Sequence, residues 1–196
     1  MNLDAELVLA INGLARRWPL LDQAMLALSF TSSLTLPGLL LGGYWIWCSR
    51  REALIGGGAL GLLILTSDWG ATRLKDLVGR VRPCQVLDSL NSLVLCGGTA
   101  SFPSNHAVNT AAAAVFFQVL YPKSGWVSWP IVALVGLSRV YIGAHYVTDI
   151  LGGWVIGGLL GGGAAFALLQ WPRFRAKIPA PVAEAPVHVT GSEGSR

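Results

Sequence analysis

Long apolar stretches constrain the fold of this chain more than any other feature of its sequence. They run roughly over residues 20–48, 52–72, 104–121, 126–142 and 146–171. A membrane-spanning helix needs about 20 apolar residues, so each of the last four stretches predicts one span. The first stretch suits one long tilted helix or, interrupted near Pro37 and Gly38, two short passes. The sequence therefore predicts an all-α, polytopic integral membrane helix bundle with five or six spans, and it favours six.

The overall composition supports a membrane protein. Of the 196 residues, 53% are hydrophobic and only 12% are charged, and the mean hydropathy is +0.57. A soluble domain carries about twice that charged fraction. The 24 glycines and 8 tryptophans suit spanning helices with aromatic anchors at the interface. The net charge of +4 is small and lies largely in short flanks and polar clusters, which argues against a nucleic-acid-binding surface.

The two ends of the chain differ from its apolar middle. Residues 1–17 carry apolar side chains at helical spacing and predict an amphipathic helix at the membrane interface, although a packing helix would show the same spacing. Acidic residues come first there and Arg16 and Arg17 come late, so no cleavable signal peptide is expected. Residues 172–196 are rich in Pro, Ala and small polar residues and predict a disordered cytoplasmic tail. One membrane-embedded domain is therefore expected over residues 1–171.

Basic residues predict the orientation of the bundle. They follow the first apolar region, occur at Lys123 and follow the last span, and alternating passes put all three positions in the cytoplasm. The loop over residues 73–103 and the turn over residues 143–146 then lie together on the outer side of the membrane. Outer segments are expected to contain few Lys and Arg residues, yet this side carries five cations. The topology does not explain them, whereas a bound anion would. They are Arg73, Lys75, Arg80, Arg82 and Arg139.

Glycines recur at intervals of four in the last apolar stretch. Gly153 and Gly157 form one such pair, and Gly158 and Gly162 form another. Small residues at this spacing let helices approach closely in lipid. We therefore expect this stretch to pack tightly against a neighbouring helix.

Three polar clusters interrupt the apolar pattern. In the first, Lys75 and Arg82 are seven residues apart, and Pro83 follows, where any helix should end. An arginine binds phosphate through two parallel N–H bonds, and a lysine acts as a point charge. Both residues suit a phosphate site, although contact with lipid headgroups would also explain them.

The second cluster is the segment SFPSNH at residues 101–106, which precedes an alanine-rich span. Pro103 suits a first helical position, and Ser101 or Ser104 would cap the free amides. A helix start attracts anions, because its N–H groups are unpaired and its dipole end is positive. His106 would stand in the first turn beside such an anion. A hydrogen-bonded histidine at a membrane boundary is the alternative.

The third cluster contains Arg139, His145 and Asp149. If one helix runs through the last two, their spacing of four brings them onto one face. A carboxylate on one imidazole nitrogen fixes the tautomer and leaves the other nitrogen free to attack. A structural pair that links two helices would use the same two residues.

Together the clusters predict phosphoryl transfer through a phosphohistidine. Cations would neutralise the phosphoryl oxygens, one histidine would attack phosphorus, and the other would protonate the leaving oxygen. The other acidic residues lack the paired spacing that holds Mg²⁺, so neither a metal nor another cofactor is expected. The non-enzymatic alternative, a protein that binds or flips lipid phosphates, would need the cations but not two histidines and an orienting acid.

The three clusters resemble the three-part signature of the type 2 phosphatidic acid phosphatase superfamily. The matching residues are Lys75, Arg82 and Pro83, then Pro103, Ser104 and His106, then Ser138, Arg139, His145 and Asp149. The resemblance implies a six-helix membrane enzyme that removes phosphate from a lipid without a metal. It also implies the roles of the site residues. His145 would be the nucleophile, Asp149 its orienting partner and His106 the general acid, and the phosphate would be bound by Lys75, Arg82, Ser104 and Arg139.

One position departs from that signature. The usual Pro-Ser-Gly-His reads Pro-Ser-Asn-His here, with Asn105 in place of glycine. Asparagine still offers a backbone N–H to a phosphate and tolerates positive φ better than most residues. We therefore count Asn105 among the phosphate-binding residues and expect the substitution to affect rate or substrate fit.

A site at the outer interface suits a phosphorylated lipid that enters sideways from the bilayer. The resemblance to bacterial lipid phosphatases implies a bacterial inner membrane, with the site facing the periplasm. Undecaprenyl pyrophosphate is the first candidate, and phosphatidylglycerophosphate, phosphatidic acid and lipid A are the alternatives. The vanadate-dependent haloperoxidases of the same superfamily are soluble, which argues against that activity here. Membrane lipids are the other expected partners, and the sequence predicts no particular oligomeric state.

Two of the three cysteines fall in the predicted outer loop. Cys84 and Cys96 would lie in an oxidising compartment, where a disulfide would close a short loop behind the phosphate site. Two free thiols packed near the membrane are the alternative. Cys48 lies near the predicted inner face, where we expect a packing residue.

Overall fold

The computed structural model describes residues 3–30, 42–97, 100–171 and 174, and the regular structure within these ranges is entirely helical. The elements follow in the order α1 (Leu3–Asn12), α2 (Pro19–Ser29), α4 (Arg50–Val78), α5 (Pro83–Val86), α6 (Asn105–Leu120), the short 3₁₀ helix η1 (Pro122–Ser124), α7 (Gly125–Tyr141) and α8 (Val147–Gln170). Residues 42–48 are helical as well. The all-α class predicted from the sequence is confirmed.

Each of the four later apolar stretches corresponds to one helix. Two helical stretches are long and apolar enough to cross a membrane: Arg50–Val86, which joins α4 to α5, and Val147–Gln170. α6 and α7 contain 16 and 17 residues, fewer than the roughly 20 of a typical span. Residues 31–41 lie outside the described part of the chain. The prediction of one or two crossings by residues 20–48 depends on this segment and is therefore not tested. The predicted tail, apart from Phe174, also lies outside it.

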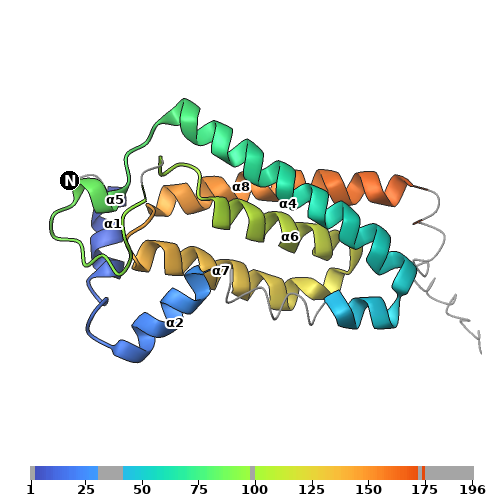
Figure 1. Cartoon of the computed structure of the whole chain (residues 1–196), viewed down its shortest axis with the longest axis horizontal. Coiled ribbons are helices and arrows are strands. Elements are labelled where there is room, and N and C mark those ends of the chain that lie inside the picture. Colours follow the sequence, from blue (N-terminus) through green and yellow to red (C-terminus); the bar gives the residue numbers. More distant parts are fainter. Residues whose placement is uncertain (1–2, 31–41, 98–99, 172–173, 175–196) are drawn as a thin grey trace, which may run out of the picture.

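α4, α6, α7 and α8 run along the long axis of the molecule (Figure 1). One end of this bundle holds the last turn of α4, α5, the start of α6 and the turn between α7 and α8. The opposite end holds the start of α4, η1 and the end of α8. The loop and the turn that the basic residues assigned to one side of the membrane therefore lie at one end of the molecule.

Backbone contact between α6 and α8 forms the centre of the bundle. A Cβ atom added to Gly157 would lie 2.1 Å from the carbonyl oxygen of Val108, and one added to Gly161 would lie 2.2 Å from that of Ala112. Gly153 is similarly close to α6. Glycine is required at these positions because any side chain would force the two helices apart. This tightly packed pair carries His106 and Asp149 in the first turns of its two helices.

Of the two glycine pairs that were predicted to pack closely against a neighbouring helix, one does so. The pair Gly153 and Gly157 is confirmed as a packing stripe, which continues to Gly161. The second pair is wrong, because Cβ atoms on Gly158 and Gly162 would meet Val115 at ordinary distances of 3.7 and 3.6 Å. A stripe that faces one partner takes every fourth residue, and Gly158 and Gly162 lie beside it on the helix.

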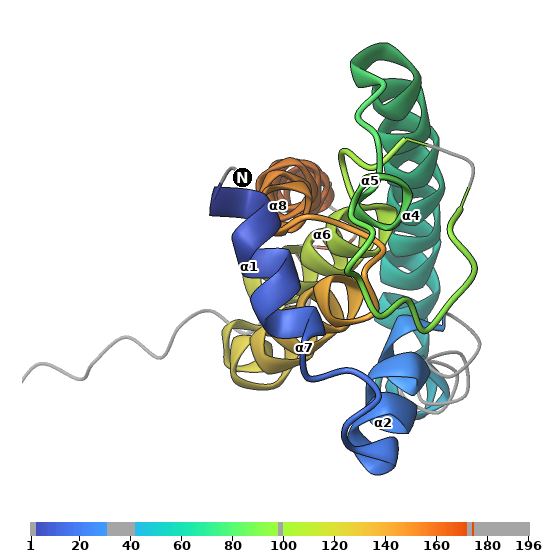
Figure 2. The ribbon, with the colours of Figure 1, turned by 90° about the vertical axis from the view of Figure 1, so that its left-hand side faces the viewer.

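α1 lies across the end of the bundle, against α7 and α8 (Figure 2). Its Ala5 and Val8 are buried in one cluster with Val140 and Ile150. This contact supports the packing-helix alternative for the N-terminal segment. The other face of α1 leaves Leu3 exposed, and contact of that face with a membrane interface stays a prediction.

Asn12 fixes the end of α1 to two distant segments. It is fully buried, and its Nδ2 donates to the carbonyl oxygens of Tyr141 at 2.7 Å and Asn91 at 3.0 Å. Its Oδ1 accepts the N–H of Asn91 at 2.7 Å. A buried amide whose donors and acceptor are all bonded fixes the geometry of the segments that it joins. The N-terminal helix is therefore part of the frame around the turn between α7 and α8.

Candidate active site

The turn between α7 and α8 presents His145. The Arg139 carbonyl oxygen accepts the N–H groups of Ala144 at 3.1 Å and His145 at 3.3 Å, which closes the turn. Gly143 has a φ of +78°, a value that glycine adopts without strain. A Cβ there would also lie 2.2 Å from a methyl carbon of Leu90. Glycine at position 143 thus allows the chain to reverse and leaves His145 buried at the end of the bundle.

His145 and Asp149 meet, but not on one continuous helix as predicted. His145 precedes α8, and Asp149 lies in its first turn. The Oδ2 atom of Asp149 accepts the N–H of Tyr146 at 2.9 Å, which caps α8, and lies 3.5 Å from Nδ1 of His145. The carboxylate therefore caps the helix and faces the imidazole at the same time.

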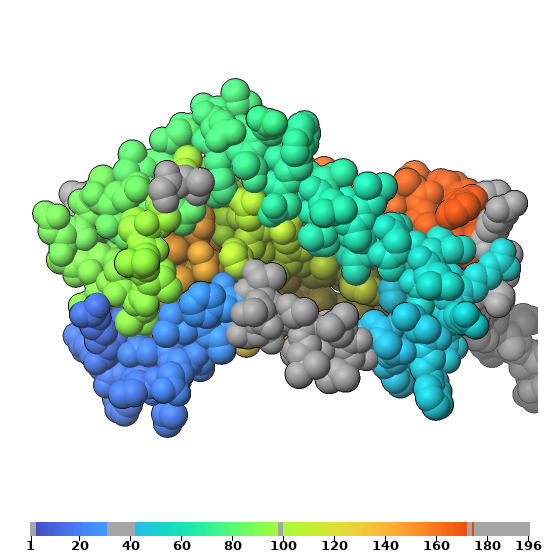
Figure 3. Space-filling model, in the orientation of Figure 1, coloured from blue at the N-terminus to red at the C-terminus, as the bar shows by residue number. Residues whose placement is uncertain are grey.

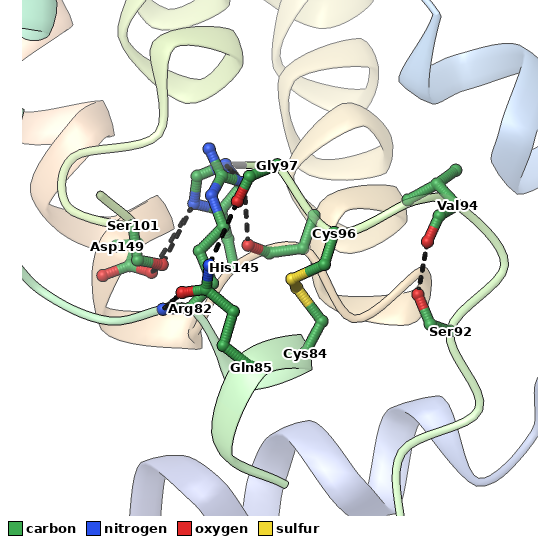
Figure 4. Close-up of a disulfide and its surroundings, with 11 residues drawn as sticks. Arg82, Cys84, Gln85, Ser92, Val94, Cys96, Gly97, Ser101, His145 and Asp149 are labelled. Atoms are coloured by element: carbon green, nitrogen blue, oxygen red, sulfur yellow. Dashed lines mark hydrogen bonds and ion pairs between the residues drawn. A yellow bond between two sulfur atoms is a disulfide. The ribbon is translucent and has the colours of Figure 1, made fainter. Parts of the chain in front are cut away.

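Ser101 contacts the same pair and was not assigned this position from the sequence. Its hydroxyl donates a short hydrogen bond to Oδ2 of Asp149 and lies 3.4 Å from Nδ1 of His145 (Figure 4). Ser101 was considered as a helix cap, but α6 begins four residues later, at Asn105. Its position instead holds the carboxylate against the imidazole.

Arg82 faces the other side of the imidazole. Its Nη1 lies 3.4 Å from Nε2 of His145 and donates to the Ala144 carbonyl at 3.1 Å (Figure 4). A guanidinium only donates, so Nε2 presents a lone pair and the proton of the neutral ring lies on Nδ1, toward Asp149. Burial chiefly, with the charges of Arg82, Arg139 and Lys75, lowers the pKa of His145 to about 4, against the opposing effect of Asp149. His145 is therefore neutral near pH 7, as a nucleophile must be.

A cavity of about 210 Å³ adjoins His145. It brings together six of the eight predicted site residues with Thr72, and its lining consists of Thr72, Lys75, Arg82, Asn105, His106, Arg139 and His145. Figure 3 shows a hollow in this region between α4 and α2, with α6 and the start of α8 on its floor. Three cations and two histidines thus share one small space, and they come from α4, the link after it, α6, α7 and the turn between α7 and α8.

Lys75 both lines this cavity and orders the chain that leads into α6. Its buried ammonium group donates to the carbonyl oxygens of Ala100 at 3.2 Å, Ser101 at 3.3 Å and Pro103 at 2.6 Å. These contacts use the three donors of a lysine. The side chain therefore fixes the segment that carries Ser101 and adds a positive charge at the cavity wall.

The end of α4 differs from the sequence prediction. α4 stops at Gly79, whose φ of +63° terminates the helix, and Pro83 is the first residue of α5. Ending the helix at Pro83 was therefore wrong. The extended link over residues 80–82 is what brings Arg82 into contact with the turn at His145.

The last residue of α2 supports both His106 and Arg139. The carbonyl oxygen of Ser29 accepts hydrogen bonds from Nη1 of Arg139 at 3.2 Å and from the imidazole of His106. The Nε2 atom of His106 is buried and has no hydrogen-bond partner among the residues that the structure describes. The bonded nitrogen is then Nδ1, and Nε2 is the nitrogen that is available to a ligand in the cavity.

Ser104 and Asn105 take different positions at the start of α6. Ser104 is the N-cap residue, but its side chain makes no capping bond, and its buried hydroxyl has no partner within the described ranges. Pro103 precedes the helix, so its predicted place in the first turn was wrong. Asn105 lines the cavity and donates its Nδ2 to Oδ1 of Asp68 at 2.8 Å.

Arg80 has a role that the sequence did not predict, because it was attributed to a bound anion and instead pairs with carboxylates. Its Nη1 donates to Oδ1 of Asp149 at 2.7 Å and to the Thr148 hydroxyl at 2.6 Å, and its Nη2 donates to Asp4 at 2.7 Å. The guanidinium also stacks on the Tyr146 ring, 4.1 Å from the centroid. Arg80 therefore orients Asp149 from the side opposite His145. Its partner Asp4 is 76 residues away, so no local spacing could have revealed the contact.

Two of the five cations that were attributed to a bound anion have other partners. Arg73 stacks over the ring of Trp69, 5.5 Å from the centroid, and Arg80 pairs with two carboxylates. The other three line the cavity. The surplus of positive charge at this end of the bundle is thus partly structural.

Arg80→Ala should lower kcat about 10- to 100-fold and leave KM within about threefold. Removing a hydrogen bond to a charged group costs about 1.5–3 kcal/mol, and here the loss would loosen the carboxylate that orients His145. Steady-state kinetics with a lipid phosphate would measure both constants. Arg73→Ala, which removes a cation away from the cavity, is the matched control. A variant of Arg80 that raised KM alone would instead identify it as a phosphate ligand.

A disulfide joins Cys84 and Cys96 next to Arg82, as the first of the two alternatives predicted (Figure 4). Gln85 in the same loop donates to the Gly97 carbonyl at 3.3 Å. A Cβ on Gly97 would lie 3.5 Å from the guanidinium carbon of Arg82. The bridge therefore holds a backbone segment against Arg82. Cys48, expected to be packed, is an exposed free cysteine.

Breaking this bridge should raise KM about tenfold with a smaller change in kcat. A disulfide of this loop length stabilises by about 2–3 kcal/mol in the chain-entropy model, and its loss would free the segment that supports Arg82. The test compares Cys84→Ser with the control Cys48→Ser in phosphate release, and mass spectrometry without reductant verifies the bridge. An unchanged KM in verified bridge-free protein would contradict this role.

Known families supply an independent comparison. A family model described as the PAP2 superfamily matches residues 56–175, which is more than half of the chain. The chain belongs to the PAP2 superfamily. The match includes the cavity residues from α4 to α8 but excludes α1 and α2. The superfamily predicted from the three polar clusters is therefore confirmed.

Individual PAP2 proteins resemble the chain over different lengths. It is 30% identical to the undecaprenyl-diphosphatase BcrC of Bacillus subtilis, over 80% of this chain and 79% of the relative. It is 34% identical to phosphatidylglycerophosphatase B of the same species, over 74% and 73%. With the lipid A 4'-phosphatase of Porphyromonas gingivalis it shares 33% identity over 57% of this chain, and it spans only half of that relative.

Two crystal structures of other proteins have similar folds. One is the first transmembrane PAP2-type phosphatidylglycerolphosphate phosphatase from Bacillus subtilis, with a TM-score of 0.67, 29% identity and coverage of 88% of this chain and 87% of the other. The other is LpxE of Aquifex aeolicus, with a TM-score of 0.65 and 22% identity, covering 84% and 95%. The second shares the fold.

Proposed function

We propose that this PAP2 chain is a lipid phosphatase that hydrolyses a membrane lipid phosphate or pyrophosphate through a phosphohistidine on His145. One observation carries the proposal: the two nitrogens of the His145 ring have opposite surroundings. Nδ1 faces the carboxylate of Asp149, and Nε2 faces Arg82 at a cavity that also contains His106. A lipid-binding site alone would not require this arrangement.

In the first half of the reaction, the Nε2 lone pair of His145 attacks phosphorus and the bond from phosphorus to the lipid oxygen breaks. Lys75, Arg82 and Arg139 neutralise the phosphoryl oxygens as charge moves onto them. His106, protonated beside the negatively charged phosphate, gives its proton to the departing oxygen. The products are a phosphorylated His145, whose Nδ1 proton remains directed at Asp149, and the lipid with one phosphate fewer, which is a lipid monophosphate when the substrate is a diphosphate.

In the second half, a water molecule attacks the phosphorus on His145. His106, now neutral, accepts a proton from that water and returns to its protonated form. The phosphorus–nitrogen bond breaks, inorganic phosphate leaves and the lone pair returns to Nε2. The side chains that act in these steps line the cavity, except for Asp149, which orients His145.

Domain organisation and location form part of this proposal. Residues 1–171 form the membrane-embedded phosphatase, with its site at the outer face of a bacterial inner membrane, and residues 172–196 form a cytoplasmic tail. The apolar helices, the common end of the loop and the turn, and the names of the relatives support this orientation. The disulfide near Arg82 also fits an oxidising compartment.

The direct test is phosphate release by detergent-purified protein in the presence of EDTA. Undecaprenyl pyrophosphate, phosphatidylglycerophosphate, phosphatidic acid and lipid A are assayed side by side. We expect release that survives EDTA from at least one of them. Binding of these lipids without release would instead support a lipid-phosphate binding or flipping protein. Release that EDTA abolishes would contradict a metal-independent mechanism.

The ionisation of His145 gives a separate prediction. Because burial lowers its pKa to about 4, the ring should stay neutral from neutral pH down to about pH 5, and nucleophilic capacity should fall only below that. An ordinary histidine would already lose half of its lone pairs near pH 6.5. Nitrogen NMR of labelled histidine should show a signal, absent in a His145 variant, that titrates near pH 4. A midpoint near 6.5 in the ligand-free protein would contradict the prediction.

A further inference from the structure

The lining of the cavity combines charged and neutral polar residues. Lys75, Arg82 and Arg139 supply the positive charge, and Arg82 lies 3.4 Å from Nε2 of His145, where the phosphoryl group must lie to be attacked. The neutral residues are Asn105, which precedes His106 at the start of α6, and Thr72, whose hydroxyl lies 3.4 Å from Nδ2 of Asn105. Since His106 protonates the departing oxygen in the proposed reaction, the leaving part of the substrate lies near Thr72 and Asn105.

Asp68 does not line the cavity itself but contacts Asn105, which does. It lies one turn before Thr72 on α4 and is exposed. Its Oδ1 accepts the side-chain amide N–H groups of Asn105 at 2.8 Å and Asn109 at 3.2 Å. Both amides come from α6, so Asp68 bridges the two helices beside the cavity. It is also near enough to Lys75 and His106 to interact electrostatically with both.

This carboxylate is unusual for its position. Asp68 precedes Lys75 by seven residues, about 10 Å along the helix and away from the end of the bundle that carries the turn at His145. It forms no ion pair with any residue that the structure describes. The side-chain amides of Asn105 and Asn109 both donate to the same oxygen, Oδ1. An acidic group at membrane depth is costly and points to a function rather than to packing alone.

The chemistry of the group restricts what it would bind. A carboxylate accepts hydrogen bonds from hydroxyl or ammonium groups and repels anions. A leaving group that is itself a phosphate, as in a polyprenyl diphosphate, would bring negative charge toward Asp68. A leaving group with a hydroxyl next to the ester, as in a glycerol or sugar phosphate, would present a donor.

We propose that Asp68, held by Asn105 and Asn109, is a specificity-determining residue that selects lipid phosphomonoesters with a hydroxyl or ammonium donor beside the ester over lipid diphosphates. The proposal rests on the proposed phosphatase function and deepens it. It replaces the sequence-based preference for undecaprenyl pyrophosphate. It also explains why asparagine, rather than the usual glycine, stands at position 105: its side chain positions the carboxylate.

Two matched pairs of probes test this selection. The first pair is 1-oleoyl-glycerol-3-phosphate and its 2-deoxy analogue, which differ in one hydroxyl. The second pair is farnesyl monophosphate and farnesyl diphosphate, which differ in the charge of the leaving group. We expect kcat/KM to favour the hydroxylated lipid and the monophosphate by about tenfold or more each, the usual scale for a charged hydrogen bond.

Asp68→Asn should reduce both ratios to within about threefold of unity, because the shape is kept and the charge is lost. Asp68→Glu moves the carboxylate by one methylene, so it should weaken the preference for the hydroxyl and keep the bias against the diphosphate. It also provides a charged variant if the amide variant does not fold. Asp76→Asn, on an exposed part of the same helix, is the matched control and should change neither ratio.

The possible results distinguish failure of the role of Asp68 from failure of the phosphatase function. Ratios that stay unchanged in both Asp68 variants, even with a lower overall rate, would show that Asp68 only joins α4 to α6 and would overturn the proposal. A wild-type preference for the diphosphate would overturn it as well. If the wild-type protein releases phosphate from none of the probes and none of the natural lipids, the phosphatase function itself fails and the selection fails with it.

Discussion

His145→Ala should lower phosphate release by about 10⁴-fold or more and prevent phosphorylation of the protein. The loss should be this large because no other described side chain offers a neutral imidazole lone pair that is oriented by a buried carboxylate and faces the cations. Rapid quenching of wild-type protein with a radiolabelled lipid phosphate should trap a label that is stable in base and labile in acid, as expected for a phosphohistidine. The variant should carry none.

Two controls make this result specific to the nucleophile. His188→Ala removes the third histidine of the chain, which the proposed mechanism does not use, and should leave both release and labelling unchanged. Binding of vanadate, a phosphate analogue, should persist in the His145 variant because the cations remain. Label found on His106 in wild-type protein would contradict the assignment, and so would a His145 variant that retains one tenth of the activity.

His106→Ala should slow the reaction about 10²- to 10⁴-fold on a lipid phosphate but far less on an activated ester such as p-nitrophenyl phosphate. The reason is the basicity of the departing oxygen. A lipid alkoxide needs a proton as it leaves, whereas p-nitrophenolate is stable without one. The Nε2 atom of His106, which has no protein partner among the described residues, is the donor that would be lost.

The time course of the His106 variant gives a sharper test. With the activated ester we expect a burst of about one nitrophenol per protein molecule, followed by slow turnover, because the variant also lacks the base that activates water. The phosphorylated protein should then accumulate. An equal loss of the burst rate on both esters would indicate that His106 binds or shapes the site rather than transferring a proton.

Much of the bundle and most of the cavity follow from local patterns in the sequence. The apolar stretches end at polar residues, so α6, α7 and α8 could be placed to within a few residues. The histidines and cations could be grouped because each lies in a short polar segment at a helix end. His145 and Asp149 were predicted to meet on one face of a continuous helix. They do meet, but across the capped turn that begins α8, where a separation of four residues also brings two side chains together.

What the sequence could not predict depends on contacts between distant segments. The Asp4–Arg80 ion pair joins residues that are 76 positions apart, and the hydrogen bond that Arg139 donates to the Ser29 carbonyl joins residues that are 110 positions apart. Ser101 was considered as a cap because serines often start helices, and only the fold shows that it bonds Asp149. The register of the glycine stripe likewise depends on which face α8 turns to α6.

The network around Asp4 has a consequence for how much of the chain constitutes a working unit. The family match begins at residue 56, yet Asp4 pairs with Arg80, and its carboxylate also binds the N–H and the hydroxyl of Thr148. Ser29 likewise supports both Arg139 and His106. A minimal fragment trimmed to the matched segment would retain every signature residue and lose their outer supports. An affinity tag is therefore better placed after residue 171 than before residue 3.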